Sequence, residues 1–330
     1  MSTSRRRALS AASGLTVCAL ALAGCGTSGS NTPASSSGSS GSGAKLQKTI
    51  VFSPLSLQPP ALKGLADALT GYAKSKGWKA VVQDPNFDPA KQNQQVTEVL
   101  SSGSAGAVWV IAVAPKSLAG TIKAAQAKGV PILVNGRPAE YGYSGAQPGV
   151  SFSYIDYTAG GKALGEQMGE CLTAKNGGKG EVLFAKSSAG QAGKAEFEKA
   201  AKAGLLSKAP GAKVVQEIEV KDRSSGQTDI GNALQGHPDL AGVMASTDEG
   251  SLGAIGAFGS AGKKLVCNAD FGGNSEVLAD VKKGTIYSSV ALQFGADMAQ
   301  SFNTLATMQG NPKAKGQVLV TPQKVVGSNG

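Results

Sequence analysis

Short apolar segments alternate with longer segments of helical periodicity along most of the chain after residue 48. The short segments are apolar without clean alternation, as expected for parallel strands that are covered on both faces. In the first half, strands are expected at 49–53, 79–83, 107–113 and 130–134. Helices are expected between them, at 61–76, 89–101 and 116–128. The Asp88-Pro89 pair predicts the start of the second helix, because it places an N-cap acceptor before a proline at the first helical position.

The same rhythm restarts near residue 158. Further helices are expected at 158–173, 191–207, 228–234, 248–261, 275–282 and 295–309. Further strands are expected at 181–185, 213–220, 242–245, 264–268, 285–290 and 317–321. Two βαβ runs of similar length predict an α/β fold with two doubly wound lobes of parallel sheet. Ligands of such sheets bind beyond the carboxyl ends of the strands, so two lobes placed face to face would share a cleft that closes by a hinge.

The N-terminal segment predicts export. Three arginines at 5–7 precede a mostly apolar stretch at 8–22, which is too short and broken for a membrane span and typical of a secretory signal. Leu22-Ala23-Gly24-Cys25 resembles the lipobox of bacterial lipoproteins, which implies removal of residues 1–24 and acylation of Cys25. The alternative is an ordinary signal with an incidental cysteine. With lipidation, the exported chain would be anchored to the outer face of the cytoplasmic membrane.

The segment after the predicted lipid site has the composition of a flexible tether. Residues 26–43 are almost entirely Ser, Gly, Thr, Asn and Pro, which cannot bury apolar surface. We therefore predict a linker over 25–44, with the folded part beginning at residue 45.

The charge and the cysteine content limit the classes of binding partner and the cellular compartment that the sequence allows. The net charge of +10 falls to +7 without the three signal arginines, and the lysines are scattered beside acidic residues, so nucleic acid is not expected as a partner. Cys18 leaves with the signal, and Cys171 and Cys267 remain in an oxidising compartment. They either form one disulfide, worth about 4–5 kcal/mol in the chain-entropy model, or stay as two free buried thiols.

Catalytic chemistry finds little support in the sequence. The single histidine, His237, precedes Pro238 in an expected turn, and one histidine with two distant cysteines gives no zinc spacing. The segment from Ser188 to Ala195 lacks the first glycine and the final Ser or Thr of a phosphate loop. We expect no enzyme, no cofactor and no metal.

Several stretches together resemble the periplasmic ribose-binding protein family of sugar ABC-transporter receptors, the type I solute-binding fold. They are Val81-Val82-Gln83-Asp84, Asp88-Pro89-Ala90-Lys91, Val130-Pro131-Ile132, Asp156 with Gly160-Gly161-Lys162, and Thr247-Asp248-Glu249 with Leu252-Gly253-Ala254. Their order and spacing over some two hundred residues carry the resemblance, which covers essentially 48–321. It implies three crossovers, near 155–157, 292–294 and 320–322, that join two lobes. One lobe would comprise 45–155 with 294–320, and the other 156–293 with 321–330.

The resemblance also implies ligand contacts from loops that follow the strands. The matching places are 56–62, 135–137, 155, 187–190, 247, 270 and 293. Four positions depart from the family pattern. The usual aromatic pair is Ala61 and Leu62, the acid before the arginine is Gly136, an expected arginine is Ala195, and an expected asparagine is Thr247. The receptor architecture is expected to persist without ribose specificity.

Individual residues can be assigned to the expected ligand site. The residues expected to contact ligand are Gln58, Leu62, Asn135, Arg137, Tyr154, Ser188, Thr247, Asp270, Phe271 and Gln293. Arg137 offers a planar fork to hydroxyls or a carboxylate, the alternative being a structural salt bridge. Asp270 would accept from adjacent hydroxyls, the alternative being a helix N-cap. We expect Asp248 to cap its own helix.

The remaining candidates are aromatic or lie at the crossover. Asp156 is expected to serve a hinge or as a cap, and Trp109 is expected in the core. Tyr141, Tyr143, Tyr154 and Phe271 flank strand ends, and together they could replace the missing aromatic pair.

The sequence thus predicts a monomeric solute-binding lipoprotein that captures a small polar ligand, a sugar or polyol, and delivers it to an ABC importer. Its partners would be a permease and an ATPase, with membrane attachment through the lipid. The alternative is a ligand-sensing module for a membrane signalling kinase.

Overall fold

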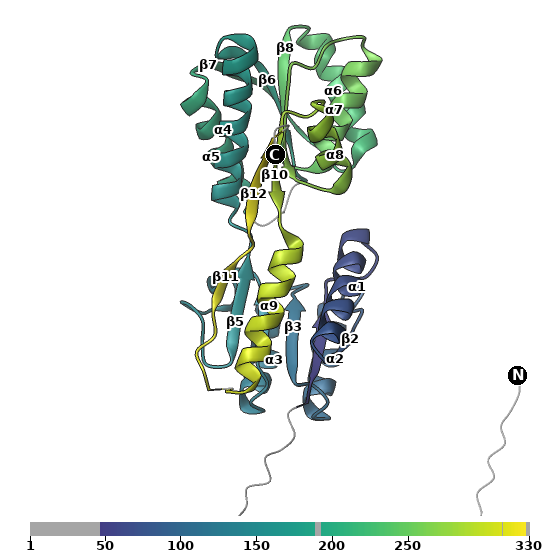
Figure 1. Cartoon of the computed structure of the whole chain (residues 1–330), viewed down its shortest axis with the longest axis vertical. Coiled ribbons are helices and arrows are strands. Elements are labelled where there is room, and N and C mark those ends of the chain that lie inside the picture. Colours follow the sequence, from purple (N-terminus) through teal and green to yellow (C-terminus); the bar gives the residue numbers. More distant parts are fainter. Residues whose placement is uncertain (1–46, 189–192, 312, 328–330) are drawn as a thin grey trace, which may run out of the picture. The chain divides into compact units, whose positions relative to one another are not determined.

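Two parallel sheets, each sandwiched between helices, organise the computed structural model of the chain, which describes residues 47–188, 193–311 and 313–327 (Figure 1). The first sheet has the strand order β11-β5-β4-β3-β1-β2, and all its pairs are parallel. Its strands are β1 (Thr49–Ser53), β2 (Lys79–Val82), β3 (Ala107–Ile111), β4 (Ile132–Asn135), β5 (Val150–Tyr154) and β11 (Val318–Val320). The predicted signal, the lipidation site at Cys25 and the tether lie outside the described residues.

The second sheet repeats this topology with the order β12-β10-β9-β8-β6-β7, in which only the edge strand β12 is antiparallel. Its strands are β6 (Lys179–Lys186), β7 (Gly211–Glu219), β8 (Leu240–Ala245), β9 (Cys267–Gly272), β10 (Ser288–Leu292) and β12 (Gln323–Gly327). The predicted fold class, two doubly wound parallel-sheet lobes, is confirmed.

Helices cover both faces of each sheet. The first sheet is covered by α1 (Pro60–Ser75) and α9 (Phe294–Gln309) on one face, and by α2 (Pro89–Ser101) and α3 (Ala119–Ala127) on the other. The second has α4 (Tyr157–Asn176) and α5 (Lys194–Lys208) on one face, and α6 (Arg223–Gly236) and α7 (Asp248–Ser260) on the other, with α8 (Ser275–Lys283) beside α7 (Figure 1). Short 3-10 turns, η1 (Pro115–Leu118) and η2 (Pro138–Tyr141), follow β3 and β4.

The chain passes between the lobes three times, and the three crossovers are hydrogen-bonded to one another. Thr321 N donates to the carbonyl oxygen of Tyr154 at 2.9 Å, and Gln293 N donates to that of Pro322 at 2.8 Å. Gln323 Nε2 donates to the carbonyl oxygen of Asp156 at 3.0 Å. A three-segment hinge of this kind keeps the crossovers in register while it lets each lobe remain a separate packing unit.

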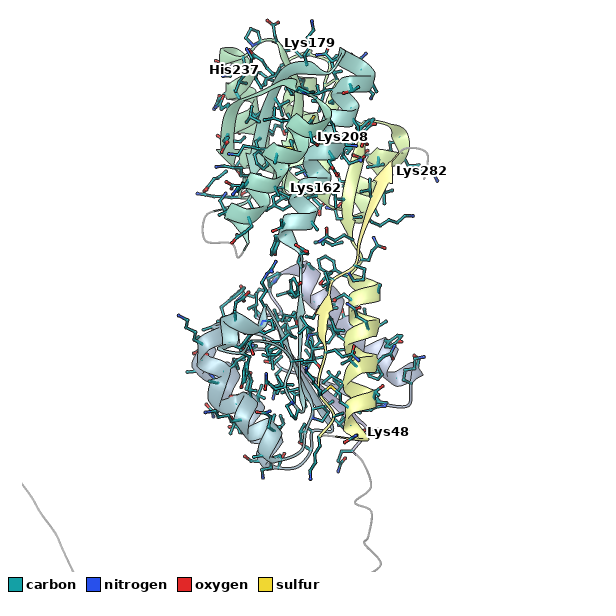
Figure 2. The ribbon with its side chains drawn as sticks, turned by 90° about the vertical axis from the view of Figure 1, so that its left-hand side faces the viewer. Lys48, Lys162, Lys179, Lys208, His237 and Lys282 are labelled. Carbon is teal, nitrogen blue, oxygen red and sulfur yellow. A yellow bond between two sulfur atoms is a disulfide. The ribbon has the colours of Figure 1, made fainter. Side chains whose placement is uncertain are left out.

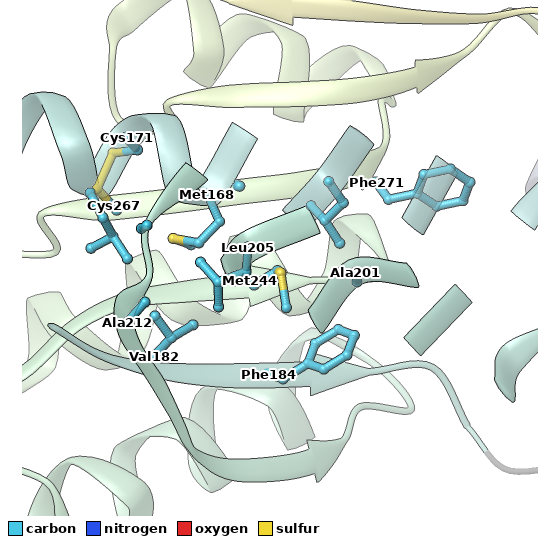
Figure 3. Packing of buried hydrophobic residues seen from close by; sticks show 14 of the residues in the cluster. Met168, Cys171, Val182, Phe184, Ala201, Leu205, Ala212, Met244, Cys267 and Phe271 are labelled. Carbon is cyan, nitrogen blue, oxygen red and sulfur yellow. A yellow bond between two sulfur atoms is a disulfide. The ribbon is translucent and has the colours of Figure 1, made fainter. Parts of the chain in front are cut away.

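Buried apolar side chains fill the space between each sheet and its helices. In the second lobe, Met168, Phe184, Leu205 and Met244 belong to one such cluster between the sheet and the α4–α5 layer (Figure 3). Cys171 of α4 and Cys267 of β9 lie at its margin and form a disulfide, with a Cα–Cα distance of 5.8 Å. The open choice between a disulfide and free thiols is thus resolved in favour of the bond.

Glycines let α4 and α5 approach each other closely. A Cβ atom on Gly161 would overlap the carbonyl oxygen of Phe197, and one on Gly165 would overlap that of Ala201. From the other side, a Cβ on Gly204 would overlap the carbonyl oxygen of Lys162. The backbones are therefore in direct contact along this seam, which larger residues would force apart.

Local signals located some boundaries and missed others. The predicted start of α2 is confirmed, since the Asp88 carboxylate accepts from Ala90 N at 2.8 Å and Lys91 N at 3.0 Å. The strands β5 and β12 were not anticipated, because serines and lysines dilute their apolar character. The predicted strand at 264–268 is wrong by three residues at its start, since β9 begins at Cys267. This shift moves Asp270 and Phe271 from a loop into the strand.

Candidate functional site

Both sheets have a topological switch point at their carboxyl edges. In the first sheet the chain goes from β1 outward to β2 and then returns to β3 on the other side of β1. The second sheet does the same with β6, β7 and β8. In open α/β sheets a ligand binds beyond the strand ends at this point, because the diverging loops leave room there. The strands β5 and β10 end at the crossovers, so both carboxyl edges adjoin the hinge.

A buried glutamine fastens the switch point of the first sheet. Gln92 of α2 is 1% exposed, and its Nε2 donates to the carbonyl oxygens of Ile111 at 3.0 Å and Pro54 at 3.2 Å. Its Oε1 accepts from Val113 N at 2.9 Å. One side chain thus holds the ends of β1 and β3 at a set separation. Sequence reasoning missed Gln92, although it occupies the buried face of α2 with Val96 and Leu100.

The loop after β1 is also bonded to the loop after β2. Gln58, which was predicted to contact ligand, is exposed, and its Nε2 donates to Asn86 Oδ1 at 2.5 Å. Asp84 Oδ1 accepts from Leu57 N at 3.3 Å and from Asn86 N at 2.9 Å. The amide of Gln58 therefore lies at the carboxyl edge with its NH₂ group already engaged, and its contact with a ligand stays a prediction.

Asn135 ends β4 within a small hydrogen-bonded group. Its Oδ1 accepts from Trp109 Nε1 at 2.5 Å, and its carbonyl oxygen accepts from the Tyr141 hydroxyl. Trp109 is fully buried beside Phe52, so the prediction of core packing is confirmed. Burial, with the charge of Glu140 beside it, raises the pKa of Tyr141, so the phenol stays a neutral donor. This group holds the Asn135 side chain in place at the carboxyl edge.

Arg137 lies between an aromatic ring and an acid at the first crossover. Its guanidinium stacks 4.5 Å from the centre of the Tyr154 ring, and Nη2 lies 3.8 Å from Asp156 Oδ1. Half of the Arg137 side chain is exposed, which leaves donors of its fork open to a ligand. Asp156 also accepts from Thr158 N and Ala159 N, both at 3.1 Å, so its predicted role as a cap is confirmed.

The second sheet presents hydroxyl groups at its switch point. Ser188 is exposed, and its Oγ donates to the carbonyl oxygen of Val220 at 3.5 Å. Residues 189 and 190 of the predicted loop lie outside the described residues. Lys194 braces this loop by donating to the carbonyl oxygen of Ser187 at 2.7 Å. Thr247 follows β8, and its Oγ1 accepts from Gly250 N at 3.3 Å as the N-cap of α7.

The structure corrects the prediction for Asp248. Thr247, and not Asp248, caps α7. Asp248 Oδ1 instead accepts from Gly273 N at 2.7 Å and Asn274 N at 3.1 Å, across the loop after β9. Asp248 therefore joins the loop after β8 to the loop after β9.

Asp270 has a different setting from the predicted one. It lies inside β9 with no exposed surface, and its oxygens accept from Ser251 Oγ at 2.5 Å and Ser289 Oγ at 2.6 Å. Asn274, and not Asp270, caps α8, so the alternative role of Asp270 as a helix N-cap is wrong. In this arrangement the carboxyl group is enclosed by protein, and its contact with a ligand stays a prediction.

The Asp270 carboxyl group forms an acid pair with Asp248. Burial, and then the charge of Asp248, raises the pKa of Asp270 to about 7, while burial also raises the pKa of Asp248. Two interacting carboxyl groups repel each other when both are ionised, so the pair favours a proton on one of them.

The other residues predicted to contact ligand lie in three different settings, namely at a crossover, in the core of the second lobe and in a groove between two helices. Gln293 lies at the second crossover, where its Nε2 donates to the carbonyl oxygen of Ala291 at 3.2 Å. Phe271 is 5% exposed and packs on Phe197 with ring centres 4.8 Å apart, so the structure places it in the core. Leu62 lies in an apolar groove of about 240 Å³ between α1 and α9, beside Phe294.

Other candidate chemistry is located away from this edge or is missing. Figure 2 shows His237 near Lys179, which begins β6, at the end of the lobe opposite the carboxyl edge. Its Nδ1 lies 3.4 Å from Glu181. Among the described residues, no group of acidic, histidine or cysteine side chains is arranged to hold a metal ion. Within the same part of the chain, no helix has the length and apolar character needed to cross a membrane.

Comparison with known proteins gives a family match over most of the chain. The sequence model described as Periplasmic binding protein domain matches residues 50–312. The ribose import binding protein RbsB of Bacillus subtilis is 28% identical over 251 residues, which cover 76% of this chain and 78% of that protein. The xylitol-binding protein of Mycolicibacterium smegmatis is 27% identical over 233 residues, which cover 69% of this chain and 63% of that protein.

Solved structures agree on the fold. A periplasmic solute-binding protein of an ABC transporter from Actinobacillus succinogenes, with bound D-allose, superposes with a TM-score of 0.72 at 17% identity, over 85% of this chain and 98% of that one. The myo-inositol binding protein of Caulobacter, bound to myo-inositol, gives a TM-score of 0.68 at 20% identity, over 86% and 94% of the two chains.

Proposed function

The chain belongs to the periplasmic binding protein family, whose members bind solutes for transport and are not enzymes, and we propose that it captures a sugar or polyol and delivers it to an ABC importer. The main support is the pairing of two switch points whose carboxyl edges both adjoin one hydrogen-bonded hinge. A ligand held there can contact loops of both lobes at once. Such a ligand favours the conformation in which both sets of contacts are made.

The side chains at these edges support a neutral, hydroxyl-rich ligand. Most are amides and hydroxyls, namely those of Gln58, Asn135, Ser188, Thr247 and Gln293. These groups can both donate to and accept from hydroxyl groups. The one cation among the predicted contacts, Arg137, is already close to Asp156, so the edge carries little uncompensated positive charge. A strongly acidic ligand therefore fits this site less well than a polyhydroxylated one.

The binding proposal is tested by thermal denaturation of the mature chain in a panel of sugars, polyols and small acids. A ligand at 100 times its Kd adds about 2.7 kcal/mol to the free energy of unfolding, which should raise Tm by roughly 5–10 °C. If sugars and polyols leave Tm unchanged, or if only acids raise it, the proposal is wrong.

A matched pair of arginine variants tests the site itself. Arg137→Gln removes the half-exposed fork and should weaken ligand binding by about 10- to 100-fold, since hydrogen bonds to charged groups contribute about 1.5–3 kcal/mol. Arg223→Gln should leave binding unchanged, because Arg223 already donates to both oxygens of Glu276, at 3.0 and 2.7 Å. Equal affinities of the two variants in isothermal titration calorimetry would remove Arg137 from the site.

We further propose that Cys25 carries lipid that anchors the exported protein, with residues 26–43 as the tether. Cys25→Ala should release the chain from the membrane fraction and abolish incorporation of labelled palmitate. Cys18→Ala is the matched control, because it changes a cysteine within the same N-terminal segment and should leave both readouts intact. Labelling that survives in Cys25→Ala would contradict the anchor.

A further inference from the structure

A half-exposed phenylalanine lies at the carboxyl edge of the first sheet, in the loop that follows β2. Phe87 is 49% exposed, and it follows Asn86 in a pair of residues with positive φ, 56° and 61°. Residues with a side chain rarely adopt this left-handed conformation. Two in succession persist only where the surrounding structure enforces them, and such places are common at ligand sites.

Three hydrogen bonds hold this loop in its conformation. Phe87 N donates to the carbonyl oxygen of Leu55 at 2.9 Å, and Asn86 N donates to Asp84 Oδ1 at 2.9 Å. The side chains of Asn86 and Gln58 are hydrogen-bonded at 2.5 Å. The loop is thereby attached to the loop after β1, which forms one wall of the switch point. Phe87 N is thus bonded directly to the loop that follows β1, at the carboxyl edge of the first sheet.

Each of the other aromatic residues predicted at this edge, Tyr141, Tyr143, Tyr154 and Phe271, is less exposed than Phe87. Tyr141 is buried, and its hydroxyl is used by Asn135. One face of Tyr154 is covered by the guanidinium of Arg137. Phe271 is part of the core of the second lobe. Phe294, at the second crossover, is also 49% exposed, but it lines the apolar groove between α1 and α9, whereas Phe87 lies in the loop after β2.

We propose that Phe87 provides the aromatic face of the ligand site and that the ligand is therefore cyclic, a ring sugar or a cyclitol. This inference rests on the proposed function. One side of a sugar or cyclitol ring presents several C–H groups as a flat apolar surface, which packs on an aromatic face while the hydroxyls at its rim meet polar groups. An acyclic polyol has no such flat surface. The amide of Gln58, next to Phe87 through Asn86, supplies a polar group at the same place.

The test measures the affinities of ring and open-chain compounds for variants of Phe87. The variants distinguish the effect of an aromatic ring from that of an apolar side chain without a ring. D-allose and myo-inositol head a panel of ring sugars and cyclitols, with xylitol and other open-chain polyols as the second group. Phe87→Leu keeps apolar volume and the backbone requirement but removes the ring, whereas Phe87→Tyr keeps the ring. We expect the tightest binding from a ring compound, a loss of at least 10-fold in Phe87→Leu, and a change within threefold in Phe87→Tyr.

Leu206→Ala is the control for removal of an exposed apolar side chain, since Leu206 is 50% exposed near the carboxyl end of α5. It should bind as the parent does, and all variants should keep the unliganded Tm of the parent. Unchanged affinity of Phe87→Leu, or tightest binding of an open-chain polyol, would overturn this inference while leaving the proposed function intact. Failure of the parent chain to bind any compound in the panel would instead overturn the proposed function.

Discussion

At the scale of single residues, the buried acid pair of Asp248 and Asp270 makes the stability of the fold depend on pH. Asp270 has no exposed surface, and the only charged groups that raise its pKa or that of its partner are Asp248 and Glu249, both acidic. The two serines that donate to Asp270 offset part of the cost of burying its charge. The raised pKa means that protonation of the carboxyl group avoids the rest of that cost.

This pair should make the protein less stable as the pH rises toward neutrality. The pKa of Asp270 is about 7 in the folded chain, against 3.8 as its ordinary value, so the folded state holds a proton that the unfolded state has lost. The stabilising contribution is therefore fully present below about pH 4 and is lost as the pH rises through about 7. Urea denaturation should give a free energy of unfolding that declines by about 2–4 kcal/mol across this window.

The Asp270→Asn variant is the control for this assignment. Asparagine keeps the shape of the side chain and one acceptor for the serines, but it does not titrate. Most of the decline between pH 4 and 7 should disappear in the variant. A decline of the same size in both proteins would assign the effect to other groups.

At the scale of secondary-structure elements, the α4–α5 pair shows how small residues determine packing. The two backbones touch along Gly161, Gly165 and Gly204, and the carbonyl oxygens of the facing helix occupy the space that side chains would need. Glycine lowers intrinsic helix stability, so its recurrence here is explained by the close approach rather than by propensity.

Adding one methyl group should have opposite effects at two helical glycines. Gly165→Ala should destabilise the protein by about 1–3 kcal/mol, because its Cβ would overlap the carbonyl oxygen of Ala201. Gly71→Ala on α1 has nothing within 4 Å of the added atom and should stabilise by about 0.5–1 kcal/mol. Chemical denaturation of both variants measures the difference. A neutral Gly165→Ala would show that the seam can open without cost.

At the scale of the whole molecule, one covalent link and one hinge constrain the chain. The disulfide joins α4 to β9 across 96 positions within the second lobe, whereas the first lobe has no disulfide among its described residues. The three crossovers are connected by hydrogen bonds only. Covalent restraint is therefore confined to one lobe, and the link between lobes remains free to bend.

Removal of the disulfide should destabilise the folded chain strongly. Cys171→Ala with Cys267→Ala should lower the free energy of unfolding by about 4–5 kcal/mol, because the unfolded chain regains the freedom of a long loop. Reductant should lower the urea midpoint of the parent protein and leave that of the double variant unchanged. A parent midpoint insensitive to reductant under unfolding conditions would contradict a stabilising role.

Some features of the fold and of the candidate site could be predicted from the sequence, and others could not. Element order, the two lobes and the start of α2 followed from periodicity and capping, which are local properties of the chain. Positions at the carboxyl edge, such as Arg137 and Thr247, followed from their place after strands and from the family resemblance. Asp270 and Phe271 were expected in a loop because the apolar signal of β9 begins with Cys267 but continues through polar residues.

The sequence by itself determined most of the segments that become strands and helices, and hence that two similar α/β units follow one another. Only the tertiary structure decided which side chains are enclosed and which remain at the carboxyl edge. Gln92 bridges the ends of β1 and β3, Asp270 is covered by Ser251 and Ser289, and the backbone of Phe87 is bonded to Leu55. Most of these partners are distant in sequence, so no local pattern encodes them. They meet because strand order and close packing bring the ends of separate strands to one edge.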